Sequence, residues 1–96
     1  MAALENYNIA IKLNPNSANV YYEIGCTMSA LGKNKLAIEN FDKSIQLNLN
    51  SAFVYYKKTV ALKALGQYEE MKPTYQKAVQ IDPNYNGFQY KHYLFS

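Results

Sequence analysis

The side chains that could carry covalent or metal chemistry are few in this sequence of 96 residues. Cys26 and His92 are its one cysteine and its one histidine, and they lie far apart along the chain. A cysteine–histidine nucleophile would need the two side chains adjacent in space, together with a third group that orients the histidine. A metal site would need several ligands of the right type. We therefore expect no enzyme activity, no bound metal and no cofactor.

The charged residues limit the binding partners. All ten basic residues are lysine, the formal net charge is +3, and there is no arginine to form a bidentate contact with phosphate or guanine. Nucleic-acid binding is therefore only a distant alternative. No apolar stretch approaches the ~18 residues that span a bilayer, the N-terminus lacks a signal-peptide pattern, and a single cysteine favours a reducing compartment. The composition predicts a single cytoplasmic domain with no membrane contact.

The elements that must position these side chains repeat with a period of 34 residues. Residues 16–18 (Asn-Ser-Ala) recur at 50–52, and residues 30–32 (Ala-Leu-Gly) recur at 64–66. A repeat of this length indicates a stack of supersecondary units, each of which buries its apolar face on its neighbours. Such stacks are usually binding scaffolds.

The apolar residues recur at helical spacing, and turn residues separate the helical segments. Ser17 is a candidate N-cap, whereas Gly32 and Gly66 are placed to end helices in the left-handed conformation. The pattern predicts an all-α fold of about six helices in antiparallel hairpins. The expected ranges are 2–13, 18–31, 35–47, 52–65, 68–81 and a last helix from about residue 87.

This spacing resembles the tetratricopeptide repeat, whose 34-residue signature is W-x2-L-G-x2-Y, then A-x3-F and a closing proline. The positions that carry the resemblance are Tyr21, Ile24, Gly25, Met28, Ala37 and Phe41 in one period, Tyr55, Leu62, Tyr75, Ala78 and Pro83 in the next, and Ala3, Tyr7 and Pro15 before them. The pentatricopeptide repeat, a 35-residue family that binds RNA, is the nearest alternative, and the 34-residue step disfavours it. The resemblance implies a solenoid with a right-handed superhelix. It divides the chain into a second-helix half repeat (1–16), full repeats (17–50 and 51–84) and the first helix of a further repeat (85–96).

The second full repeat departs from the family pattern. Lys58 and Thr59 occupy the leucine–glycine positions, and Met71 replaces the alanine that lets two helices approach closely. Leu49, in the first full repeat, stands where the closing proline is expected. Lys58 must extend its ammonium group to solvent or pair it, because burying a charge is costly. Pro73 lies inside a predicted helix, so we expect either a kink there or a helix that begins near Pro73.

The resemblance also implies a binding surface, since members of this family usually bind ligands on the concave surface lined by the first helix of each repeat. Tyr22, Tyr56 and Tyr90 recur there at 34-residue steps, and tyrosine suits peptide recognition because it combines apolar area with a polar tip. The alternative is that these rings only fill space between helices. The candidate groove residues are Asn19, Tyr22, Cys26, Phe53, Tyr56, Lys57, Val60, Tyr90, Lys91 and Leu94.

The charges at these positions disfavour one mode of binding known in the family. Some relatives hold acidic C-terminal tails in a clamp of lysines and asparagines, but of the equivalent positions here only Lys91 has the expected basic side chain. Lys57, Lys63 and Lys91 could form a positive rim that attracts acidic peptides, although solvated surface lysines are commoner.

Two classes of function follow from the sequence. The first is a protein-interaction scaffold that binds a peptide or partner helix in a tyrosine-lined groove. The second is a structural spacer of a longer array that self-associates end to end. Residues 1–13 correspond to 35–47 and residues 86–96 correspond to 18–28, so two chain ends could complete a repeat between molecules. A fragment of a longer protein is the alternative explanation for such ends.

Overall fold

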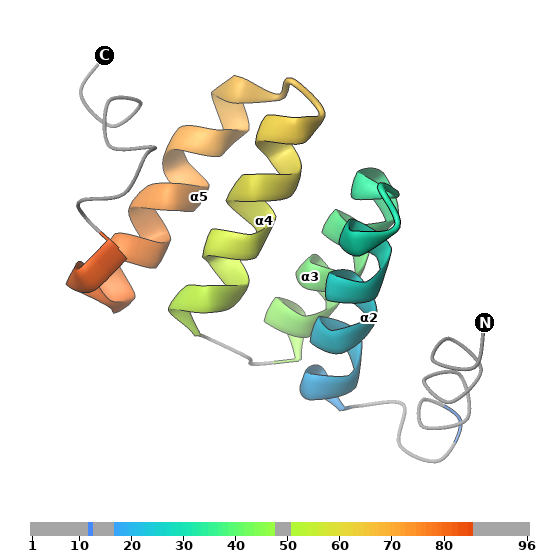
Figure 1. Ribbon diagram of the computed structural model, residues 1–96. Coiled ribbons are helices and arrows are strands. Elements are labelled where there is room, and N and C mark those ends of the chain that lie inside the picture. The colour runs from blue at the N-terminus through green and yellow to red at the C-terminus, as the bar shows by residue number, and fades with distance from the viewer. Residues whose placement is uncertain (1–11, 13–16, 48–50, 86–96) are drawn as a thin grey trace. The chain divides into compact units, whose positions relative to one another are not determined.

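The computed structural model describes residue 12 and residues 17–47 and 51–85. Within these ranges the chain forms four α-helices and one short 3-10 helix, and no strand (Figure 1). The elements are α2 (Ala18–Ala30), α3 (Asn34–Gln46), α4 (Ala52–Ala64), α5 (Tyr68–Ile81) and η1 (Pro83–Tyr85). The all-α prediction is confirmed. The helices predicted at 2–13 and from residue 87 lie outside the described residues, so the count of six stays a prediction.

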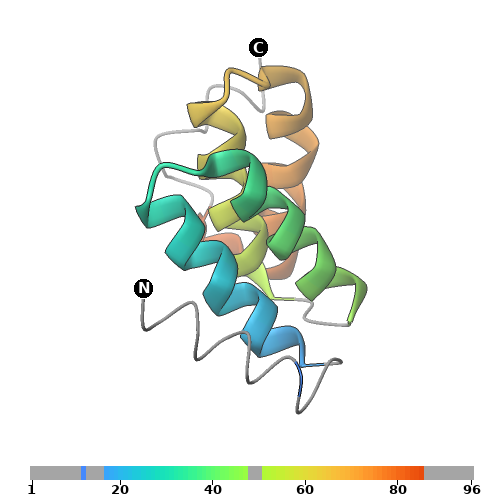
Figure 2. The same cartoon turned by 90° about the vertical axis from the view of Figure 1, so that its right-hand side faces the viewer.

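The chain divides into two compact units, Met1–Leu49 and Asn50–Ser96. The first unit contains α2 packed on α3, which we call the first hairpin, and the second contains α4 packed on α5, the second hairpin. In each hairpin the two helices lie side by side and antiparallel (Figures 1 and 2). The predicted helix-hairpin repeat is therefore present twice.

The helix ends agree with the predicted ones to within one residue, and their caps explain why. The Ser17 backbone is extended, and its hydroxyl accepts a hydrogen bond from the Val20 N–H at 3.3 Å, as an N-cap should. Gly32 and Gly66 follow α2 and α4 with φ of +77° and +75°. An L side chain is strained at such angles, so glycine is the residue that allows each hairpin to turn.

The first hairpin depends on a close approach between α2 and α3. Ala37 and Phe41 of α3 are fully buried, and Gly25 of α2 faces them. A Cβ atom at Gly25 would lie 2.6 Å from both Cδ1 and Cε1 of Phe41 and 3.2 Å from the Ala37 carbonyl oxygen. The Ser44 hydroxyl adds a second tie, donating a 2.7 Å hydrogen bond to the Ala18 carbonyl at the start of α2.

The second hairpin replaces the small residues of this contact with larger ones. Thr59 stands at the position of Gly25 and Met71 at that of Ala37, and both are fully buried, as is Tyr75. The Thr59 hydroxyl donates to the Tyr55 carbonyl of its own helix at 2.8 Å, so its burial leaves no unpaired donor. Lys58 is half-buried. A lysine can occupy such a position by packing its aliphatic stem.

The prediction of a late helix start at Pro73 is wrong. Helix α5 begins at Tyr68 and continues to Ile81 with Pro73 inside it. The helix tolerates this proline because Pro73 and Glu69 are exposed, so solvent can satisfy the Glu69 carbonyl that lost its donor. Glu69 and Glu70 in the first turn also favour a helix that starts there, because they complement the helix dipole. A bend at Pro73 stays a prediction.

Gly25→Ala should lower the free energy of unfolding by about 1–3 kcal/mol, because the new methyl group overlaps the Phe41 ring. Helix propensity alone predicts the opposite sign, a gain of about 1 kcal/mol. Urea unfolding followed by circular dichroism measures the difference. In a Phe41→Leu background the cost of Gly25→Ala should largely disappear. Gly32→Ala is the matched control: nothing lies within 4 Å of its added Cβ, so its cost should come from the backbone alone and persist in that background. A stabilising Gly25→Ala would contradict the close approach.

Pro73→Ala should raise the free energy of unfolding by less than the ~3 kcal/mol that an interior proline costs, since it restores a donor for the Glu69 carbonyl. Part of the gain is offset because alanine leaves the unfolded chain more flexible. The same urea titration tests this, with Thr74→Ala as a neighbouring control. The Thr74 hydroxyl bonds only its own helix, at the Glu70 carbonyl, and that bond is exposed, so its loss should change little. A destabilised Pro73→Ala would show that the native backbone depends on the proline.

Candidate functional site

Helix α2 places three of the predicted groove residues on one face. Asn19, Tyr22 and Cys26 are spaced i, i+3 and i+7, which brings their side chains to the same side of a helix. Asn19 is exposed, while Tyr22 and Cys26 are half-buried. This face of α2 thus offers a short polar side chain, an aromatic ring and a thiol, and the exposed Glu23 adjoins it with a negative charge.

Tyr22 agrees in part with both interpretations of the repeated tyrosines, as rings that contact a partner and as rings that fill space between helices. Its ring centroid lies 5.9 Å from that of Phe41 at an interplanar angle of 39°, a favourable tilted aromatic contact. Part of the ring therefore packs on the core of the first hairpin, as a space-filling residue would. The ring is nevertheless only half-buried, so it also keeps surface that a partner could contact.

Helix α4 repeats the arrangement with a different chemistry. Phe53, Tyr56 and Val60 have the same i, i+3 and i+7 spacing, and Lys57 adjoins them. Phe53 is 41% exposed, Lys57 is exposed, and Tyr56 and Val60 are half-buried. An aromatic side chain with this exposure is available for contact with a partner. The face of α4 is therefore more apolar than that of α2 and carries one positive charge.

The remaining predicted residues cannot be compared with the structure. Tyr90, Lys91 and Leu94 lie outside the described residues, as do His92 and the C-terminal segment 86–96. Of the N-terminal segment 1–13 the description includes only Lys12, which is exposed. The structure thus brings together three candidates on α2 and four on α4. One continuous groove across both hairpins stays a prediction.

Within residues 17–47 and 51–85, together with residue 12, no three side chains of histidine, cysteine, aspartate or glutamate are grouped to hold a metal ion.

No helix among the same residues has both the length and the apolar character needed to cross a bilayer.

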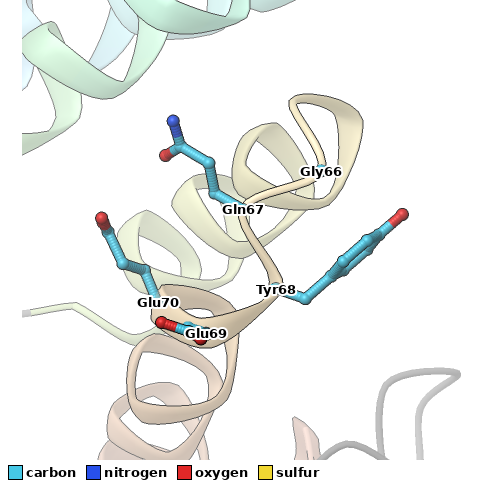
Figure 3. A pocket seen from close by; sticks show the side chains of 5 residues that line it. All are labelled: Gly66, Gln67, Tyr68, Glu69 and Glu70. Atoms are coloured by element: carbon cyan, nitrogen blue, oxygen red, sulfur yellow. The ribbon is translucent and has the colours of Figure 1, made fainter.

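A shallow depression lies at the turn between α4 and α5, and the sequence did not point to it. It is lined by consecutive residues, Gly66 to Glu70, and Figure 3 shows the Tyr68 side chain directed away from those of Gln67 and Glu70. One five-residue segment cannot surround a ligand on several sides. The depression is therefore a feature of the hairpin turn rather than a small-molecule pocket.

Comparison with solved structures finds the same fold. A structure of MamA MSR-1 superposes with a TM-score of 0.70 at 25% sequence identity, over 84% of this chain and 51% of that one. A structure of MamA AMB-1 gives a TM-score of 0.71 at 24% identity, over 97% of this chain and 53% of that one. The chain thus spans about half the length of these proteins. The search among curated proteins found no significant match.

Family models agree with the hairpin geometry. A model described as "TPR repeat" matches residues 2–32, and one described as "Tetratricopeptide repeat" matches residues 18–51 and 54–85. The second model alone covers well over half of the chain, and its two matches span the first hairpin and all of the second except residues 52 and 53. The chain therefore belongs to the tetratricopeptide repeat family, whose members generally act as protein-interaction modules.

Proposed function

We propose that this chain is a protein-interaction scaffold that binds a peptide or partner helix along the exposed faces of its first helices, α2 and α4. The observation that carries the proposal is the aromatic surface of α4, where Phe53 is 41% exposed beside the half-buried Tyr56. The equivalent Tyr22 on α2 is half-buried as well. Rings with both apolar area and a polar tip are the side chains that most often anchor protein interfaces.

The side chains on these faces favour a particular kind of peptide. Phe53, Tyr56 and Val60 offer apolar area for one or two apolar side chains, and the exposed Lys57 can attract a carboxylate. On α2, Tyr22 and Cys26 stand at the positions where a carboxylate clamp would need basic or amide side chains. The preferred ligand is therefore an amphipathic segment with apolar side chains and a single acidic group near Lys57, not a tail with paired carboxylates.

The two tyrosines differ in how clearly a substitution would report binding. Because Tyr22 packs on Phe41, Tyr22→Ala would disturb the first hairpin as well as any bound peptide. Tyr22→Phe keeps the ring and removes only the hydroxyl. Tyr56→Ala on α4 is the more direct probe, with circular dichroism to confirm that the fold is kept.

The test selects ligands from a random library of 12-residue peptides displayed on phage, then measures Kd by fluorescence anisotropy. Tyr56→Ala should raise Kd at least about 10-fold, the loss expected at an interface hot spot. Lys57→Ala should raise Kd less, and mainly at low salt, because an exposed charge acts through a screened field. Tyr68→Ala on α5 is the matched control, since it removes an exposed tyrosine from another helix and should leave Kd unchanged within about 2-fold.

Two outcomes would contradict the proposal. In the first, the library yields no specific peptide, which would show that α2 and α4 do not form a peptide-binding surface. In the second, peptides bind Tyr56→Ala as tightly as the wild type, which would show that they bind at another surface. The first outcome would favour a structural spacer, in which the repeats 17–50 and 51–84 only hold flanking segments apart. End-to-end association through 1–13 and 86–96 stays a prediction, because these segments, apart from Lys12, lie outside the described residues.

A further inference from the structure

The turns of the two hairpins carry most of the exposed apolar side chains of the described residues. Leu31 and Leu36 flank the first turn and are each 43% exposed, and Leu65 and Tyr68 flank the second at 40% and 53%. Among the large apolar and aromatic side chains exposed in the described part of the chain, only Phe53 lies elsewhere. We call residues 31–36 the first tip and residues 65–70 the second tip.

The two tips have the same backbone and opposite charges. Each turns at a glycine with positive φ, Gly32 or Gly66. The first tip contains Lys33 and Lys35 and no acidic residue, whereas the second contains Glu69 and Glu70 and no basic residue. All four charged side chains are exposed. The chain therefore presents two apolar patches of similar kind with two positive charges on one and two negative charges on the other.

The two lysines of the first tip lie where a positive charge is electrostatically unfavourable. Lys33 precedes α3 and Lys35 lies in its first turn, where the helix dipole already presents partial positive charge. An anionic surface placed against this tip would therefore interact with the lysines and with the helix terminus together. Glu69 and Glu70 supply such a surface beside apolar side chains that match Leu31 and Leu36 in exposure.

We propose that the first tip of one molecule docks on the second tip of another copy of this chain. The occupant is a second copy because the complementary charge and the complementary apolar surface both occur on the chain itself. The contact is heterologous, so it leaves one tip of each kind available and builds either closed rings or open chains. It uses a surface other than the proposed peptide-binding faces of α2 and α4.

Each tip is small, so the contact belongs with weak, transient interfaces that bury less than about 1,200 Å². Sedimentation velocity of the full chain should accordingly show association only towards high concentration, up to about 1 mM, and less of it in 0.5 M NaCl because exposed charges are screened. Apolar contact alone would not weaken with salt.

Reversing the charges of each tip tests whether the two tips form the contact. Glu69→Lys/Glu70→Lys makes both tips basic, and Lys33→Glu/Lys35→Glu makes both acidic, so each variant alone should lose at least about 10-fold in association constant. A mixture of the two variants should associate again, because acidic tips then meet basic ones. The matched control, Glu23→Lys/Glu39→Lys, makes the same charge change at two exposed glutamates outside the tips and should still associate.

The mixture also answers the objection that a variant has simply unfolded, since unfolded chains would not restore binding. The proposal is overturned by a wild type that stays monomeric to 1 mM, by association that the tip variants do not change, or by a mixture that fails to associate. A monomer destabilised by either variant, and restored when all four substitutions are combined, would assign the attraction to tips of the same molecule. None of these results bears on peptide binding to Tyr56, so the two proposals fail independently.

Discussion

The structure of each hairpin depends on how closely its two helices can approach. In the first hairpin a glycine hydrogen is the largest group that fits opposite the Phe41 ring, because a Cβ atom would come within 2.6 Å of two ring carbons. That restriction selects glycine at residue 25, and the Ala37 carbonyl oxygen, 3.2 Å from the same point, limits the space further. The buried Ser44 hydroxyl reinforces the pairing, bonding the Ala18 carbonyl where α3 passes the start of α2. Close packing of this kind tolerates little change in volume.

The second hairpin shows that the same fold accepts another solution. Thr59, Met71 and Tyr75 are all fully buried, so the larger residues fill the interface without leaving unpaired polar atoms among the described residues. The threonine hydroxyl returns to its own helix, at the Tyr55 carbonyl, and thus needs no partner across the interface. This hairpin preserves a filled interface in which every described buried polar side-chain atom has a hydrogen-bond partner, although Thr59 and Met71 replace the glycine and alanine typical of the family.

This packing also shapes the surfaces that are left for partners. Phe41 fills the space against Gly25 and at the same time supports the Tyr22 ring, so the core of the first hairpin sets how much of that tyrosine remains exposed. Helix α4 leaves Phe53 41% exposed beside Lys57. Turns closed by glycine leave Leu31 and Leu65 near 40% exposed as well. The surface proposed for binding is therefore what remains after each short hairpin has buried one face of each helix.

The sequence by itself determined the four described α-helices, their ends and the repeat, because these depend on local spacing, on caps such as Ser17 and on glycines that must adopt positive φ. It also identified Gly25, Ala37 and Phe41 as positions of the family pattern, but their contact across the first hairpin is known only from the structure. Only the tertiary structure decided how Pro73 is accommodated, because that depends on whether solvent reaches the Glu69 carbonyl. The division of the Tyr22 ring between core and surface, and the exposure of apolar side chains at both tips, likewise follow from three-dimensional packing that no local pattern encodes.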